Sequence, residues 1–291
     1  MKGRTYFLLG IAAISIITLF IVYGSILNQP REKIELIFLT PPAVYRPLEK
    51  AILYFNENSE TYRILTIVQP TGALVNRLKL DQRGDVFGSA DSIYMEKLVE
   101  EGFIHREKIF LLSYSIPAMI VPKGNPAGIH SLKDLAEKNV PIGIANPDVS
   151  PAGRIAVEVL KQNEIYERVK DRIVIFSDIN ELARQVSLGL LPVGISWHFI
   201  YYWNPNELDI VWLDKDEIPG IECQLIGVLK TSNNSEVAEH VIKSILEYAK
   251  KNGELRRYGY ITSLEDLQLI TPYDNVSWTL PSICILGVKY G

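Results

Sequence analysis

The sequence is poor in the residues that hold metals. Its 291 residues include only two cysteines, Cys223 and Cys284, and four histidines. The cysteines lie far apart, without a C-x-x-C spacing and without paired histidines, so a structural zinc site has too few ligands. They form either one disulfide or two buried free thiols, and we favour the free thiols because nothing in the spacing requires a bridge.

A surplus of positive charge is also missing. The chain carries 30 Lys and Arg against 34 Asp and Glu, which gives a net charge of −4. Proteins bind nucleic acid largely by displacing counterions with their own cations, so we expect no nucleic-acid partner. The sequence has no G-x-S-x-G elbow, no H-E-x-x-H helix and no Walker loop. We therefore expect a protein that is not an enzyme and that needs no cofactor.

Charged residues are absent from one long stretch near the N-terminus. Tyr6–Leu27 is 22 residues without a charge and follows Lys2 and Arg4. This is longer than the core of a signal peptide and about long enough to span a bilayer. The preceding positive charges place the N-terminus in the cytoplasm. We expect residues 1–30 to be a membrane anchor or signal segment with its tether, preferably uncleaved, and the rest of the chain to lie on the extracytoplasmic face of the membrane.

Beyond this segment, short apolar runs alternate with stretches of helical spacing. The chain is 47% hydrophobic, which suits about two domains with cores of their own. This pattern predicts an α/β protein with mainly parallel sheets. The expected strands are residues 34–39, 62–68, 84–87, 118–121, 141–145, 173–176, 193–196, 210–213 and 224–229, and the clearest helices are residues 131–138, 151–162, 180–188 and 235–253.

Four predicted strand-to-helix junctions are rich in small and hydroxyl residues: Thr40–Ala43, Thr71–Ala73, Gly88–Asp91 and Asn146–Gly153. Ligand sites of open α/β sheets lie at such junctions, and small residues let backbone amides approach an oxyanion closely. Each junction taken alone is better explained by ordinary helix capping. Trp197, at the end of a predicted strand, either packs in the core or faces the same crevice.

Two of these segments together resemble a known family. Gly84–Asp91 is similar to the A-D-V-F-x-S-A-D signature of the molybdate- and tungstate-binding proteins of ABC transporters, and Ala145–Arg154 is similar to their A-x-P-x-x-x-P-A-G-R segment. The resemblance extends over roughly residues 34–260. It implies the two-lobed type II fold of periplasmic binding proteins, in which two α/β lobes joined by crossover strands close on a tetrahedral oxyanion.

The resemblance also implies a division of the chain and a set of ligand contacts. Ser89 matches a serine that donates its hydroxyl and amide, Ala152 and Ile179 match amide donors, and Trp197 stands where many members have tyrosine. The first contact falls near Ala43, or near Thr40 if that loop is shifted. The implied lobes are residues 31–113 with 224–260, and residues 114–223, with crossovers near 113–119 and 222–227 and an extension of unreadable role at 261–291.

The function implied by the resemblance is the capture of molybdate or tungstate for an ABC transporter permease. Its partners would be the oxyanion, the permease subunits and, through residues 1–30, the membrane, and the protein would be a monomer. Sulfate and vanadate are alternative ligands. An extracytoplasmic enzyme or sensor on the same fold is the alternative function, and His198 and Asp91 are its candidate titratable groups.

Overall fold

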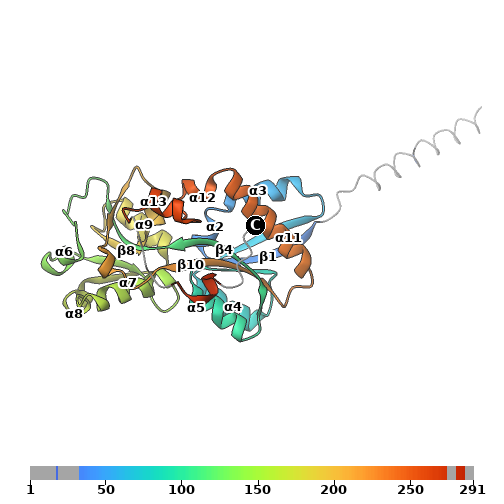
Figure 1. The fold of residues 1–291 in the computed structure, drawn as a ribbon, viewed down its shortest axis with the longest axis horizontal. Helices are drawn as coiled ribbons and strands as arrows, with labels where there is room; N and C mark the ends of the chain where they lie inside the picture. Colours follow the sequence, from blue (N-terminus) through green and yellow to red (C-terminus); the bar gives the residue numbers. More distant parts are fainter. Residues whose placement is uncertain (1–17, 19–32, 274–279, 286–291) are drawn as a thin grey trace, which may run out of the picture.

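The structure is a computed structural model that describes residues 18, 33–273 and 280–285. It has two lobes side by side (Figure 1). The predicted membrane segment falls outside the described residues apart from Thr18. Among the residues that are described, no helix is long and apolar enough to cross a membrane.

The first lobe is built on a five-stranded sheet with the order β2-β1-β3-β10-β4. Strands β1, β2 and β3 run parallel, whereas β10 pairs antiparallel with both β3 and β4. The two sheet faces are covered by separate apolar clusters, one including α3 and α11 and the other α4 and α5. The strands are β1 (Ile34–Thr40), β2 (Tyr62–Val68), β3 (Val86–Ser89), β4 (Ile104–Ser115) and β10 (Glu222–Leu229), and the helices are α2 (Pro42–Tyr45), α3 (Glu49–Asn58), α4 (Thr71–Asp81), α5 (Ser92–Glu100), α11 (Ser235–Lys251) and α12 (Glu254–Arg257).

The second lobe repeats this plan with the strand order β7-β6-β8-β5-β9. Strand β6 is parallel to β7 and β8, and β5 is antiparallel to β8 and β9. Helices α7 and α9 pack against this sheet. The elements are β5 (Pro117–Pro122), α6 (Leu132–Glu137), β6 (Ile142–Ala145), α7 (Pro151–Gln162), α8 (Tyr166–Val169), β7 (Ile173–Phe176), α9 (Ile179–Ser187), β8 (Gly194–Trp197), α10 (Phe199–Trp203) and β9 (Leu208–Trp212), with 3-10 turns at Lys170–Arg172 and Lys215–Glu217.

The expected two-lobed α/β fold is therefore confirmed, but the sheets are mixed rather than mainly parallel. The sequence did not predict β4, whose first half contains His105, Arg106, Glu107 and Lys108. These side chains interrupt the apolar run because one side of an edge strand faces water. The later half of β4 is mostly buried and pairs with β10.

Three segments connect the lobes. The chain leaves the first sheet at Ile116, between β4 and β5, and returns between β9 and β10. The third segment is the chain after α12, which forms a bridge between Ile261 and Tyr114 of β4 and then continues onto the second lobe; the three segments together form the hinge. Beside it, the fully buried His198 accepts a hydrogen bond from the Ile116 amide at Nδ1 (3.2 Å) and donates from Nε2 to the Gly259 carbonyl (2.8 Å). The ring is held neutral, and burial lowers its pKa to about 4.

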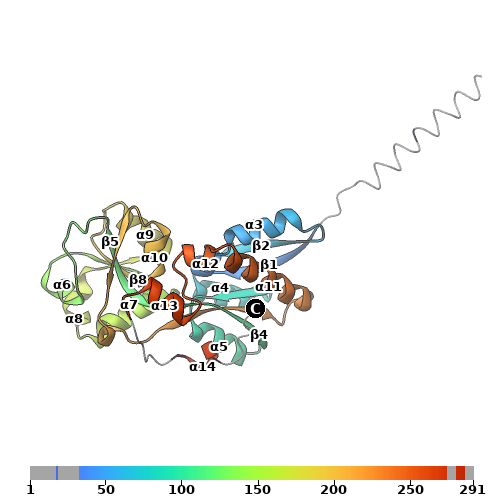
Figure 2. The ribbon, with the colours of Figure 1, turned by 45° about the horizontal axis from the view of Figure 1, so that its top comes forward.

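The two cysteines form a disulfide, with a Cα–Cα distance of 6.0 Å. Our preference for free thiols was wrong because the bridge depends on where the end of the chain packs. Helix α14 (Ser282–Ile285) lies beside α5 of the first lobe (Figure 2), where Ile283 and Cys284 are buried. No local spacing predicts this meeting of residues 61 positions apart.

The extension beyond residue 260 also packs on the second lobe. Helix α13 (Leu264–Ile270) ends where the Tyr202 hydroxyl donates to the Ile270 carbonyl at 3.1 Å. The Tyr273 hydroxyl donates to the Leu213 carbonyl at 2.6 Å, in the connection between β9 and β10. The described parts of the extension therefore cover both lobes near the hinge.

Replacing both cysteines, Cys223→Ala with Cys284→Ala, should lower the free energy of unfolding by about 4 kcal/mol, because the bridge closes a long loop in the unfolded chain. Denaturant unfolding followed by circular dichroism measures the loss. Reductant should destabilise the parent protein and leave the double variant unchanged. Equal stability of parent and variant would contradict the prediction.

His198 should make the folded state sensitive to acid. Its pKa is lowered from 6.5 to about 4 in the folded protein, so the unfolded chain binds the extra proton first. The stability that this group contributes is present above pH 6.5 and is lost as the pH falls toward 4. Melting temperatures between pH 7 and pH 4 should fall less steeply in His198→Gln, whose amide can keep one donor and one acceptor. Parallel pH profiles would refute this role.

Candidate functional site

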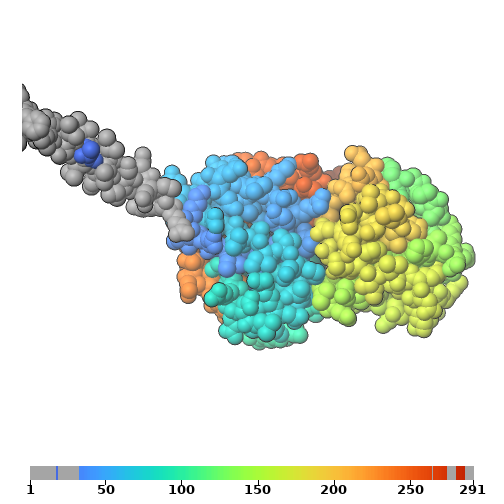
Figure 3. Space-filling model, turned by 180° about the vertical axis from the view of Figure 1, so that it is seen from behind, coloured from blue at the N-terminus to red at the C-terminus, as the bar shows by residue number. Residues whose placement is uncertain are grey.

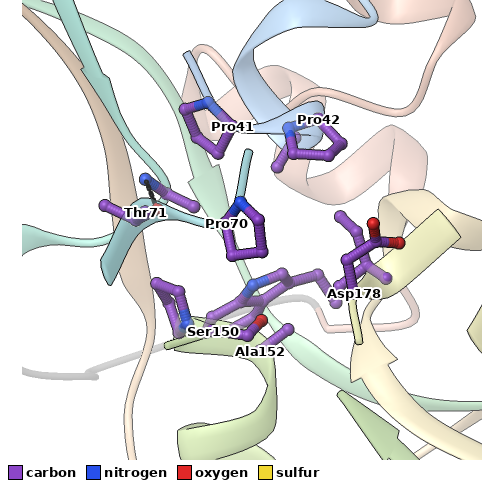
Figure 4. Close-up of a pocket in the computed structure, with 12 residues that line it drawn as sticks. Pro41, Pro42, Pro70, Thr71, Ser150, Ala152 and Asp178 are labelled. Atoms are coloured by element: carbon purple, nitrogen blue, oxygen red, sulfur yellow. Dashed lines mark hydrogen bonds between the residues drawn. The ribbon is translucent and has the colours of Figure 1, made fainter. Parts of the chain in front are cut away.

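A small pocket lies between the lobes, at the ends of the strands. Its cavity volume, measured as the space open to the centre of a water-sized sphere, is about 20 Å³. This volume suits a water molecule or a compact ion and leaves no room for a sugar. Figure 3 shows the lobes in contact on the face seen there, and the Gly72 amide donates to the Val149 carbonyl of the other lobe at 2.9 Å. The pocket is lined by Pro41, Pro42, Ala43, Pro70, Thr71, Ala90, Ser150, Pro151, Ala152, Asp178, Ile179 and Trp197 (Figure 4).

The topology brings these residues together. In the first lobe the parallel strands β1, β2 and β3 end at the loops that carry Pro42, Thr71 and Ala90. In the second lobe β6 and β7 lead through short loops to the helices that begin near Ala152 and at Ile179, and β8 ends on Trp197. Carboxyl ends of parallel strands share one edge of a sheet, and here the two edges face each other across the pocket.

Three helices of ordinary length begin at the pocket: α4, α7 and α9, with 11, 12 and 9 residues. The first-turn amides of a helix have no acceptor within it, and the helix dipole adds partial positive charge there. Thr71, Ala152 and Ile179 supply such amides. The α7 turn packs tightly on β6, since a Cβ at Gly153 would lie 2.1 Å from the Ala145 carbonyl oxygen.

Trp197 contributes a side-chain donor. The residue is 1% exposed, and its indole nitrogen has no hydrogen-bond partner among the described residues. A buried N–H without an acceptor destabilises a protein unless a ligand or water satisfies it. Because Trp197 lines the pocket, an acceptor placed there can satisfy this donor.

Asp178 is the pocket-lining residue with an ionisable side chain. Its Oδ1 accepts hydrogen bonds from the amides of Asn180 (2.8 Å) and Glu181 (3.0 Å), so it caps α9. The carboxylate points away from Ser150 and Ala152 (Figure 4). None of the described residues that line the pocket is Lys, Arg or His, so an anion there is held by neutral donors.

Four of the six predicted contacts meet in this pocket: Ala43, Ala152, Ile179 and Trp197. Thr40 and Ser89 are fully buried next to it but do not line it. The Ser89 hydroxyl donates to the Asp91 carbonyl at 2.7 Å, and the Thr40 hydroxyl lies 3.4 Å from the Pro41 carbonyl oxygen.

Sequence reasoning left eight of the twelve lining residues out of the site, among them Thr71 and Asp178. Thr71 carried the same signal as the other junctions, a hydroxyl residue at a helix start, and its Oγ1 accepts from the Ala90 amide at 3.4 Å. The two groups that the sequence offers to an enzyme lie elsewhere. His198 is engaged at the hinge, and Asp91 pairs with Arg154.

Comparison with known proteins gives a sequence match and a structural match. The molybdate-binding protein ModA of Rhodobacter capsulatus is 25% identical over 199 residues, which cover 66% of this chain and 75% of that protein. The periplasmic molybdate-binding protein of Azotobacter vinelandii superposes with a TM-score of 0.66 at 17% identity, covering 78% of this chain and 99% of the other.

Other ligands occur among structural neighbours. The sulfate-binding protein SubI of Mycobacterium tuberculosis superposes with a TM-score of 0.65 at 12% identity, covering 83% of this chain and 93% of the other. Residues 36–260 match the sequence profile of the bacterial extracellular solute-binding protein family. The chain therefore belongs to this family and has the type II fold of periplasmic solute-binding proteins.

Proposed function

We propose that this solute-binding protein captures a tetrahedral oxyanion, molybdate or tungstate, and delivers it to the permease of an ABC transporter. The observation that carries the proposal is the unpartnered indole N–H of Trp197 in a pocket formed by helix N-termini. A pocket that presents donors without basic side chains is suited to a small anion with acceptors on every side.

The ligand must be strongly stabilised because a dianion loses its hydration on burial. Hydrogen bonds to a charged group are stronger than neutral ones, and a helix N-terminus contributes up to about 2 kcal/mol in partly buried geometry. The amides of Thr71, Ala152 and Ile179 and the Trp197 indole come from both lobes. They can therefore be satisfied together only when the lobes are closed.

The choice of anion follows from the donor pattern. A fully deprotonated anion can accept from every donor, whereas the O–H of a protonated anion needs an acceptor. Among the described residues that line the pocket, the carboxylate is that of Asp178, and it is engaged with its own helix. Sulfate has the same charge as molybdate and a smaller size. Molybdate and tungstate are proposed because two relatives, which this chain matches over 75% and 81% of their length, carry molybdate in their names.

The location follows the family, whose members are extracellular. We propose that residues 1–30 hold the protein at the outer face of the cell membrane, as an uncleaved anchor or as a signal segment. The binding unit acts as a monomer whose partners are the oxyanion and the permease.

Calorimetric titration of the full chain in detergent with molybdate, tungstate, sulfate and vanadate tests the proposal. One oxyanion should bind per chain, with molybdate and tungstate tighter than sulfate. Absence of binding to all four anions would refute the oxyanion function. Tighter binding of sulfate would keep the site and change its ligand.

Trp197→Phe should weaken molybdate binding by about 1.5 to 3 kcal/mol, because one hydrogen bond to a charged ligand is lost. The folding stability should fall only as much as in Trp203→Phe, since both variants remove the same buried ring volume and an N–H without a partner among the described residues. Calorimetry and thermal melting measure the two effects. Trp203→Phe is the matched control, because Trp203 is also buried but does not line the pocket. Reduced stability of Trp197→Phe with unchanged affinity would assign Trp197 to the core alone.

A further inference from the structure

Beside the pocket lies a second set of contacts between the lobes. The Arg154 guanidinium, on the first turns of α7, forms an ion pair with Asp91, the N-cap of α5. The Gly72 amide donates to the Val149 carbonyl at 2.9 Å. None of these four described residues lines the pocket. They therefore join the lobes without touching the ligand.

The charges of this cluster are mostly removed from water. Asp91 is fully buried, and the Arg154 side chain is 27% exposed. Asp91 also accepts from the Tyr94 amide at 3.1 Å, and the Arg154 guanidinium lies 5.7 Å from the Tyr94 ring centre. A buried carboxylate is costly unless a cation accompanies it. Here the cation comes from the other lobe, so only closure supplies it.

A second carboxylate of the first lobe stands nearby. Glu222 accepts hydrogen bonds from the amide (3.0 Å) and hydroxyl (2.8 Å) of Ser92, and burial together with the Asp91 charge raises its pKa. When the lobes separate, Asp91 and Glu222 remain together while Arg154 leaves with α7. Closure therefore offsets a local excess of negative charge next to the loop that carries Ala90.

Gly72 also allows close contact between the lobes. A Cβ at this position would lie 2.7 Å from the Tyr94 hydroxyl and 2.9 Å from the Val149 Cα of the other lobe. Only a glycine lets the first turn of α4 and the loop before α7 approach this closely. The contact and the ion pair thus form one unit at the rim of the cleft.

We propose that Asp91, Arg154, Gly72 and Val149 form an inter-lobe clasp that stabilises the closed state independently of the ligand and so slows ligand release. The inference rests on the proposed oxyanion function for its ligand. The clasp residues are positioning residues: they hold the donors of the two lobes together and do not contact the anion.

Release of molybdate from the full chain, followed by stopped-flow tryptophan fluorescence, tests the clasp. Arg154→Gln should raise the release rate at least about tenfold, because a buried pair is broken, and should change the association rate by less than about threefold. Asp91→Asn, which keeps an N-cap, should also accelerate release. The double variant should release no faster than Arg154→Gln, since paired groups are not additive.

Two further variants separate the clasp from a general effect on folding. Glu158→Gln removes the partner of Arg154 on its own helix, 3.8 Å away, and should leave release unchanged. Gly72→Ala hinders closure without altering charge and should accelerate release. Parental release rates in Arg154→Gln and in Gly72→Ala, both with parental melting temperatures, would overturn the clasp.

Small-angle scattering of the ligand-free proteins distinguishes failure of the clasp from failure of the proposed function. Arg154→Gln should have a larger radius of gyration than the parent, because its lobes open more often. If the parent binds no oxyanion, the proposed function fails, and a larger radius in Arg154→Gln still supports the clasp. Equal radii would refute it.

Discussion

The cleft depends on amide groups that a helix cannot satisfy by itself. Each of the helices α4, α7 and α9, which begin there, leaves its first N–H groups without intrahelical acceptors. Parallel strands fix where those helices begin, because a strand that ends at one sheet edge delivers the chain to the next helix at the same edge. Six such strand ends, three from each lobe, meet at one pocket. The binding chemistry is thus a property of the backbone path more than of particular side chains.

The charges are arranged in two different ways within a short distance. The pocket is lined by neutral donors, whereas the adjoining rim carries the Asp91–Arg154 pair. For the proposed oxyanion, a neutral lining avoids a general attraction of anions and leaves the ligand to satisfy the Trp197 indole. The ion pair serves the protein itself, since its partners belong to different lobes. On the proposed function, specificity and the lifetime of the complex therefore depend on separate residues.

The family resemblance placed Ala43, Ala152, Ile179 and Trp197 as neighbours in one pocket, whereas local patterns in the sequence were sufficient only for the strand-to-helix junctions. They failed where distant segments decide the structure. Strand β4 was missed because the exposed face of an edge strand is charged, and the disulfide was missed because α14 packs on the first lobe long after Cys223 has been placed. Asp178 was missed because a helix cap gives no sign of what lies beside it.

The insertion of the second lobe into the first fixes the order in which the sheets can be completed. A ribosome that makes the chain from its N-terminus finishes β5 through β9 before β10 exists. The second sheet can then assemble from one continuous stretch, while β3 and β4 still lack the strand that lies between them. Their unpaired edges are open to wrong partners during that interval. The sheet of the first lobe is therefore begun before that of the second lobe and completed after it. The disulfide between Cys223 and Cys284 closes later still.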